Sequence, residues 1–536
     1  MMVTKNYNIL NDCRGMYEEE IFEMILESRG IKDVDEFLYP TEDNLLPLDS
    51  LLYIEDAAKR VQQAVENNEK IVILWDTDTD GASSGAIITR YLNHFTNEPV
   101  ECFIDEGKRH GLKGEDLAKF KDFDLLIIVD SLDENVNQYK ELSESGVDII
   151  ILDHHAIKEN VPYDDYTILV SSQRHYDNSQ LSGAGIVWKF CKYLDEKYGT
   201  SYADELIDLA ACGIVADMMD MTVMENRYIV YQGLQKICNP AIKKIVGSFP
   251  FNSTAISFSI APIINAANRM GKNEVAVKAF MADENKEVLK YIKELKACKE
   301  DQNKEVDRLL PDVLEQCGKQ LDKKIITVFI TTEYGVAGLL GNKLLERYQR
   351  PILVLKDVGT KYAGSMRATG VDDFRKICNE SGLSKVDGHE LAAGIQIKKE
   401  NLDKFLSYIE ENLPELKTDM TVDVDAQIDI SDVTRRLVDL VKKIDFVSGS
   451  GFKPLRFYIN GITEYEIGQM SDFKHLVVKP NDFLQIIKWN FGGSFEEMDD
   501  HAIMGDELEV VCSLDSGFFG RKFVLKAVCD EIEEVI

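Results

Sequence analysis

The 536-residue sequence contains no run of 18 or more uncharged apolar residues, so it offers no candidate transmembrane helix. Its first residues, MMVTKNYNILNDC, lack the apolar core of a signal peptide. The ten cysteines include no CxxC pair, which argues against a zinc site or a disulfide framework. We therefore expect a cytoplasmic protein with reduced, buried thiols and no membrane partner.

Basic residues are also scarce. The chain has 61 Lys and Arg against 94 Asp and Glu, a net charge of −33. A nucleic-acid-binding protein normally presents a basic face, so this balance argues against tight, non-specific binding to duplexes. Any nucleic-acid path must be kept apart from most of the acidic residues. The length predicts about three domains, because one hydrophobic core does not grow this large.

The most informative stretch is Ile71–Ser84, IVILWDTDTDGASS. Five apolar residues run directly into three aspartates at alternate positions, Asp76, Asp78 and Asp80. A short apolar run of this kind predicts a strand buried on both faces of a parallel sheet. Ligands bind beyond the carboxyl ends of such strands. Three carboxylates there repel one another, and all-oxygen ligation suits Mg²⁺ or Mn²⁺.

Two more predicted strands end in the same way. Leu125–Val129 leads into Asp130, and Asp148–Leu152 leads into Asp153, His154 and His155. Aspartate is common after strands because it caps helices and tolerates turns, so one such ending would mean little. Three endings that a single sheet would place side by side favour a metal site.

A fourth acidic candidate lies in the mostly apolar stretch Asp208–Met221. A lone acid in an apolar helix is costly unless it is paired or ligates a metal. Asp217 and Asp220 both qualify.

In this order, the DTDTDG, Asp130 and Asp-His-His elements resemble the DHH phosphoesterase superfamily. Later elements resemble its RecJ branch: Ile260–Gly271 is similar to a PxxNAAGR sequence and Gly449–Pro454 to a GxGNPxP sequence. Gly364–Arg367 and Asp387–Gly394 are similar to the GSGRS and GGHxxAAG signatures of the DHHA1 domain. The resemblance covers essentially the whole chain.

The resemblance implies an α/β fold with a parallel-sheet DHH catalytic domain, a long linker helix, a smaller α/β DHHA1 domain and a C-terminal, OB-like β-barrel. We expect a helical lead-in at 1–70, the catalytic domain at 71–275 and the connecting helix at 276–320. The DHHA1 domain is expected at 321–415 and an OB-fold-like nucleic-acid-binding domain at 416–536.

The resemblance also implies site residues. Two Mn²⁺ or Mg²⁺ ions would be held by Asp76, Asp78, Asp80, Asp130, His154 and Asp217. Catalysis would fall to Asp78, Asp80, Asp130, His154, His155 and Asp217, with Asp153 or a neighbouring carboxylate fixing the His154 tautomer. Substrate phosphate would be bound by Arg109, Arg269, Ser365, Arg367 and His389.

The function that the resemblance implies is degradation of single-stranded DNA from 5′ to 3′ into mononucleotides, in DNA repair and recombination. The protein would act as a monomer, and a single-strand-binding protein or a helicase would be its further partner. One alternative is a DHH phosphodiesterase for short oligonucleotides or cyclic dinucleotides; another is a non-catalytic replisome scaffold. Three positions depart from the glycine usual in the family: Asn268, Met366 and Asp387.

Overall fold

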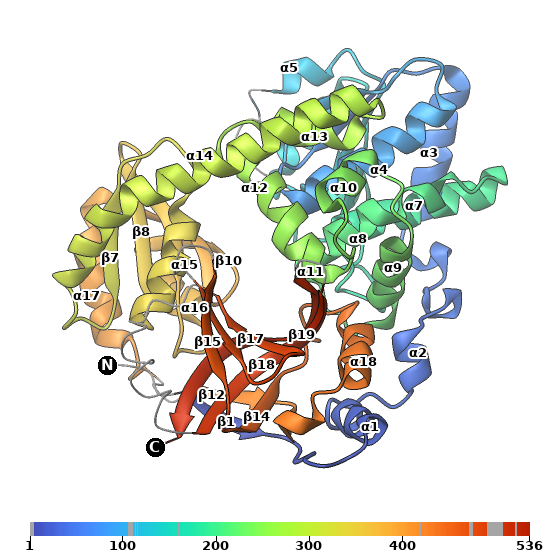
Figure 1. Cartoon of the computed structure of the whole chain (residues 1–536). Coiled ribbons are helices and arrows are strands. Elements are labelled where there is room, and N and C mark those ends of the chain that lie inside the picture. Colours follow the sequence, from blue (N-terminus) through green and yellow to red (C-terminus); the bar gives the residue numbers. More distant parts are fainter. Residues whose placement is uncertain are drawn as a thin grey trace.

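The protein is described from a computed structural model that covers residues 5–104, 111–112, 114, 116–158, 160–416, 420–470, 475–489, 507–519 and 522–535. Figure 1 shows three bodies arranged as an open ring. The N-terminal sheet and its helices form one body, a second α/β body lies at the far end of the long helix α14, and a C-terminal β body lies below both.

The first body is built on a five-stranded parallel sheet in the order β3-β2-β4-β5-β6. The central strands β2 and β4 are buried along their whole length, as their apolar sequences predict. Because the strands are parallel, their carboxyl ends meet at one edge. The strands are β2 (Ile71–Trp75), β3 (Glu101–Ile104), β4 (Leu125–Val129), β5 (Asp148–Asp153) and β6 (Ile168–Ser171).

Helices pack on both faces of this sheet, as the two hydrophobic clusters on its opposite faces show. The helices that precede β6 are α1 (Glu18–Ser28), α2 (Val34–Leu38), α3 (Ile54–Asn67), α4 (Thr79–Phe95), α5 (Leu117–Phe120) and α6 (Val136–Glu144). Of these, α1 lies beside α18 (Arg435–Asp445) of the C-terminal body (Figure 1). The helices that follow β6 are α7 (Gly183–Tyr198), α8 (Ile207–Ala216), α9 (Met224–Gln235), α10 (Pro240–Val246), α11 (Ser253–Ala255), the π-helix η5 (Ile256–Ile260), α12 (Ala261–Arg269) and α13 (Asn273–Met281). Short 3₁₀ turns are η1 (Glu42–Asn44), η2 (Leu48–Ser50), η3 (Tyr163–Asp165) and η4 (Tyr202–Glu205). No described helix is both long and apolar enough to cross a membrane.

Helix α14 (Asn285–Gly318) leads to the second body, a five-stranded mixed sheet in the order β10-β11-β9-β8-β7. Its strands are β7 (Ile326–Ile330), β8 (Ile352–Asp357), β9 (Lys361–Arg367), β10 (Ser384–Gly388) and β11 (Ala392–Lys398). Its helices are α15 (Ala337–Tyr348), α16 (Phe374–Glu380), η6 (Lys399–Asn401) and α17 (Leu402–Asn412). The connecting helix and the smaller α/β domain are therefore present.

The C-terminal body contains a seven-stranded sheet whose described strands pair in the order β13-β14-β18-β19-β17-β16-β15. Its elements are β12 (Met420–Val424), β13 (Ala426–Asp429), η7 (Ile430–Asp432), α18 (Arg435–Asp445), β14 (Phe457–Ile462), β15 (Glu466–Met470), β16 (His475–Lys479), β17 (Leu484–Lys488), β18 (Glu507–Phe519) and β19 (Lys522–Val535). The sequence did not predict that β1 (Lys5–Ile9) pairs in parallel with β12. The chain's first strand is thus tied to its last domain.

One buried cation joins three parts of the chain. Arg227 of α9 is 1% exposed, and its guanidinium lies 3.5 Å from the ring centroid of Phe37 and 5.5 Å from that of Phe452. It donates hydrogen bonds to the carbonyls of Phe37 and, at 2.8 Å, of Val447. Burial lowers the pKa of this guanidinium to about 9. The lead-in, the first body and the C-terminal body therefore share one hydrogen-bond donor.

We expect Arg227→Met to lower the apparent Tm by roughly 5–10 °C, because two buried carbonyls lose their donor while the volume is largely kept. Differential scanning fluorimetry of the full chain measures this. Arg435→Met is the matched control, since the Arg435 side chain is 74% exposed and should leave Tm unchanged. Equal Tm values for both variants would show that the buried donor adds nothing to the joint.

Candidate metal centre and phosphate-binding residues

The first group of acidic residues is placed by the turn from β2 into α4. The Asp78 carboxylate caps α4, with Oδ1 accepting from the backbone N–H of Asp80 at 3.0 Å and of Gly81 at 3.1 Å. A helix N-terminus favours negative charge, so the fold offsets part of the cost of this carboxylate. The next acid, Asp80, is directed into the interior and is 2% exposed.

Asp80 caps a second helix, α7. Its Oδ1 accepts from Ser182 Oγ at 2.8 Å and from the Ala184 N–H at 3.1 Å, and its Oδ2 accepts from the Gly183 N–H at 2.8 Å. This approach requires small neighbours, because a Cβ added to Gly213 would lie 2.2 Å from Asp80 Oδ1. Small residues of α7 and, at Gly213, of α8 therefore allow the backbone to approach this carboxylate closely.

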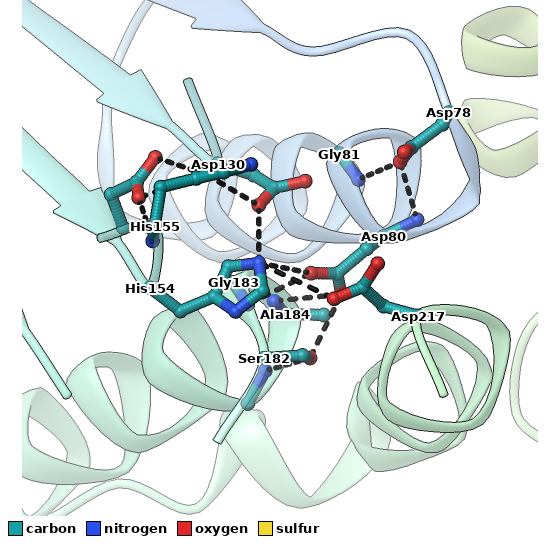
Figure 2. A network of polar contacts seen from close by, with 12 residues as sticks. Asp78, Asp80, Gly81, Asp130, His154, His155, Ser182, Gly183, Ala184 and Asp217 are labelled. Carbon is teal, nitrogen blue, oxygen red and sulfur yellow. Dashed lines mark hydrogen bonds and ion pairs between the residues drawn. The ribbon is translucent and has the colours of Figure 1, made fainter. Parts of the chain in front are cut away.

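Three carboxylates surround the imidazole of His154 (Figure 2). Its Nε2 lies 3.3 Å from Asp130 Oδ1, 3.4 Å from Asp217 Oδ2 and 3.8 Å from Asp80 Oδ2. Asp130 follows β4 with a φ of +54°, a left-handed conformation that aspartate tolerates better than most residues. Three strand endings and the C-terminus of α8 thus converge on one imidazole.

Burial and mutual repulsion dominate the electrostatics of this cluster. Burial, together with the Asp78 charge, raises the pKa of Asp76 well above its usual range. Burial and the charges of Asp80, Asp78 and Asp76 do the same for the pKa of Asp130. The pKa of Asp80 is also raised by burial, and that of Asp217 rises to about 8 through burial and the Asp80 charge. Without a cation, the ionised cluster is strongly disfavoured.

The second histidine has a different partner from the first. His155 Nδ1 lies 3.0 Å from Asp153 Oδ1, and Asp153 Oδ2 also accepts from the Leu132 N–H at 2.8 Å. Burial raises the pKa of Asp153, but the His155 charge and hydrogen bonds outweigh it and leave a value of about 2. Asp153 therefore orients His155, and of the two expected partners for His154 it is the neighbouring carboxylates, Asp130 and Asp217, that approach this imidazole.

Asp217 and Asp220, the two candidates near the end of α8, are separated by the fold. Asp217 is the residue that approaches His154. Asp220 accepts from the N–H and hydroxyl of Thr222 at 2.8 and 2.7 Å, and lies against Gly451 of the C-terminal body. The Asp220 carboxylate therefore stabilises a turn through Thr222, and Asp217 is the one that joins the cluster around His154.

The ligand atoms fall into overlapping groups of three within 4.8 Å of one another. One group is Asp76, Asp78 and Asp130; another is Asp80, His154 and Asp217; a third joins Asp130 to His154 and His155. Oxygen-rich groups with one imidazole suit Mn²⁺ or Mg²⁺ better than soft metals. Asp130 Oδ1 is buried without a hydrogen-bond partner among the described residues, which fits an oxygen that awaits a cation.

Three of the residues expected to bind phosphate lie near this centre. The pKa of Arg269 is lowered by burial but raised by the Asp78 charge, so its guanidinium lies within reach of the metal loop. Burial and the Arg269 charge lower the pKa of Arg367. Arg367 Nη1 donates to Ser365 Oγ at 2.6 Å. Within the described residues, neither arginine has an acidic ion-pair partner.

The other expected phosphate contacts are less central. Arg109 lies outside the described residues. The His389 side chain is exposed, and the hydrogen bond described for this residue is a backbone one to Ala392 O at 3.2 Å. Met366 is fully buried in the hydrophobic core of the second body, on the face of β9 opposite Ser365 and Arg367. Asp387 is exposed on β10.

The sequence interpretation missed two residues on α14, which it treated as a solvent-exposed linker. Gln302 is 1% exposed and its Oε1 lies 3.5 Å from Arg269 Nη1. Lys299 has its pKa lowered by burial and by the Arg269 charge. A lone glutamine among Cys298, Val306 and Leu309 on the buried face was the available signal. The helix therefore contributes polar atoms to the surroundings of Arg269.

Comparison with known proteins gives the class. The model of the DHH family, N-terminal domain, matches residues 70–214, and that of the DHHA1 domain matches residues 322–415. Residues 70–214 thus match the DHH family and residues 322–415 match the DHHA1 domain, as the sequence predicted.

Within this class the chain is RecJ-like. It is 28% identical to the putative SPbeta prophage-derived single-strand DNA-specific exonuclease YorK of Bacillus subtilis, over 88% of this chain and 87% of that one. RecJ of the same organism is 26% identical, over 85% of this chain and 60% of its own length. The Thermus thermophilus RecJ structure with Mn²⁺ has the same fold, with a TM-score of 0.80, 21% identity and coverage of 100% of this chain and 80% of that one. The expected fold class is confirmed.

Repulsion in the cluster predicts how metal affects stability. We expect Mn²⁺ to raise the Tm of metal-free protein by several degrees, because the cation removes the carboxylate repulsion. Asp130→Asn should raise the Tm of the metal-free protein, because one repelling charge is removed, and should reduce the rise in Tm that Mn²⁺ causes. Asparagine also tolerates the left-handed backbone at this position, so the change should not strain the turn. Thermal scans in EDTA and in Mn²⁺ measure both. A lower metal-free Tm for Asp130→Asn would contradict the repulsion argument.

Proposed function

We propose that the chain is a metal-dependent exonuclease that degrades single-stranded DNA from 5′ to 3′ into mononucleotides, in DNA repair and recombination. The observation that carries this proposal is the pair of ligand groups, Asp76-Asp78-Asp130 and Asp80-His154-Asp217, next to two arginines that have no acidic partner in the described part of the chain. Relatives covering most of the chain are named single-stranded-DNA-specific exonucleases. Two Mn²⁺ or Mg²⁺ ions are the proposed cofactors, in keeping with RecJ structures that hold each metal.

The chain's own residues have distinct proposed tasks. Asp76 and Asp78 would hold one cation and Asp80, His154 and Asp217 the other, with Asp130 between them. When bound, such a pair of ions activates a water and stabilises the attacking and leaving oxygens of an in-line displacement. His155, which is partly exposed and oriented by Asp153, would polarise the scissile phosphate.

The 5′ to 3′ direction of degradation would be set by residues that bind the phosphate at the 5′ end. Ser365 and Arg367 of β9 and Arg269 of α12 would bind the terminal 5′ phosphate, since a planar guanidinium matches two phosphate oxygens. Arg109 and His389 remain proposed contacts. We also propose that the protein works in the cytoplasm as a monomer, on single strands exposed by a helicase or covered by a single-strand-binding protein.

The two alternatives are less favoured. A phosphodiesterase for short oligonucleotides or cyclic dinucleotides does not need the seven-stranded C-terminal sheet or the joint that Arg227 makes with it. A non-catalytic scaffold does not need a full set of buried ligands that destabilises the metal-free protein. The cluster around His154 keeps every expected ligand type.

Removal of one ligand should abolish hydrolysis. We expect Asp217→Asn to lower Mn²⁺-dependent release of mononucleotides from a 5′-labelled single strand by at least about a hundredfold, because a cation loses a charged ligand. Asp220→Asn, the same change three positions away in a turn, is the control and should keep activity. Wild-type protein that leaves long strands intact but cleaves dinucleotides would support the small-substrate alternative instead. Intact strands that are bound but not cut would support the scaffold.

Recognition of the 5′ end should depend on Arg367. We expect Arg367→Gln to lower kcat/KM by about 10- to 100-fold on a 5′-phosphorylated strand and to change it little on a 5′-hydroxyl strand, because the fork of donors is lost. Single-turnover assays with both ends measure the difference. Arg347→Gln, on α15 of the same domain, is the control. An equal loss on both ends would place Arg367 elsewhere along the strand.

A further inference from the structure

The helix α12 contacts the metal loop through two asparagines one turn apart. Asn268 Nδ2 donates to Thr77 Oγ1 at 2.8 Å, and Thr79 Oγ1 donates to Asn265 Oδ1 at 3.1 Å. Side chains at i and i+3 share a helix face, so both asparagines point at the same loop. The two threonines alternate with the aspartates of DTDTDG. Each threonine of the loop is therefore held by α12 while its acidic neighbours remain available to a cation.

Asn268 is unusual in two respects. It stands where glycine is usual in the sequences that this segment resembles, so its side chain is a feature of this chain. It is also 5% exposed, and its Oδ1 is buried without a hydrogen-bond partner among the described residues. Buried polar atoms normally form hydrogen bonds, so the position of this amide is set by the one bond that its nitrogen donates to Thr77.

Thr77 is buried between two of the candidate metal ligands, so a contact that holds Thr77 also constrains them. Thr77 is 4% exposed and lies directly between Asp76 and Asp78, two members of one ligand group. Groups that hold metal ligands in place from behind commonly change metal affinity about 10- to 100-fold when removed.

We propose that Asn268 is a positioning residue of the metal centre. Through Thr77 it fixes the directions of the Asp76 and Asp78 carboxylates, and it thereby sets the affinity of one of the two cation sites. This inference rests on the proposed metal-dependent function and adds a determinant that replaces glycine in this chain. It concerns metal binding, so it can be tested without DNA.

The test is a titration of the metal-free full chain with Mn²⁺. Binding is measured by calorimetry and, independently, by the EPR signal of free Mn²⁺. We expect Asn268→Ala and Asn268→Gly to weaken one of two sites by about 10- to 100-fold and to leave the other within a few-fold. Thr77→Val should weaken the same site, whereas Thr77→Ser, which keeps the hydroxyl, should retain its affinity. Thr89→Val is the matched control, because Thr89 is 1% exposed and lies in the same domain with its hydroxyl at Cys102.

A double variant decides whether the two residues act together. If Thr77 and Asn268 act together, the double variant Thr77→Val/Asn268→Ala should bind Mn²⁺ with the same affinity as either single variant. Losses that multiply, or an Asn268→Ala protein that binds two Mn²⁺ ions as wild type does, would overturn the proposal. If Asn268→Ala does not fold, as judged by circular dichroism, the comparison of Thr77→Val with Thr77→Ser decides alone. A wild-type protein that binds Mn²⁺ but does not cut DNA would overturn the proposed function and leave this test intact.

Discussion

The repulsion among buried carboxylates around His154 is the constraint on which the rest of the site depends. Four aspartates there have raised pKa values because they are buried beside one another. The fold offsets part of this cost with two helix N-termini, since Asp78 caps α4 and Asp80 caps α7. The remaining repulsion is a cost that bound cations would offset. The fold therefore holds these carboxylates together at the expense of the stability of the metal-free protein.

The same reasoning explains how a chain with a net charge of −33 can bind a polyanion. Many of its described cations are used in ion pairs, as Arg29 is with Asp425 at 2.6 Å and Arg60 with Glu69 at 2.6 Å. Arg269 instead lies close enough to Arg367 for its charge to lower the pKa of the Arg367 guanidinium, which burial lowers first. Local concentration of positive charge beside bound metal ions can attract a phosphate even when the rest of the surface repels it. The overall charge would then select for strands whose end reaches this point.

Part of this arrangement could be predicted from the sequence. The apolar runs ending at Trp75, Val129 and Leu152 identify adjacent parallel strands, and parallel strands bring their following residues together. The pairing of β1 with β12 could not be predicted, because Lys5 and Met420 are more than four hundred residues apart and neither strand has a distinctive pattern. The capping of α7 by Asp80 was also hidden, since it depends on the angle between two helices. Gln302 was missed because one polar residue on a helix face carries little signal on its own.

Helix α12 connects the two halves of the site mechanically. At its buried face Asn265 and Asn268 hold the metal loop, and its last residue, Arg269, approaches Gln302 of α14 at 3.5 Å. The Arg269 carbonyl also accepts from the Gly335 N–H of the DHHA1 domain at 2.9 Å. Both contacts lie on one helix of nine residues, so the metal loop and Arg269 are positioned by the same element. Any coupling between strand binding and cation binding through this helix must be reciprocal. A strand end bound at Arg269 that strengthened cation binding would then itself be bound more tightly, by the same factor, when the cations are present.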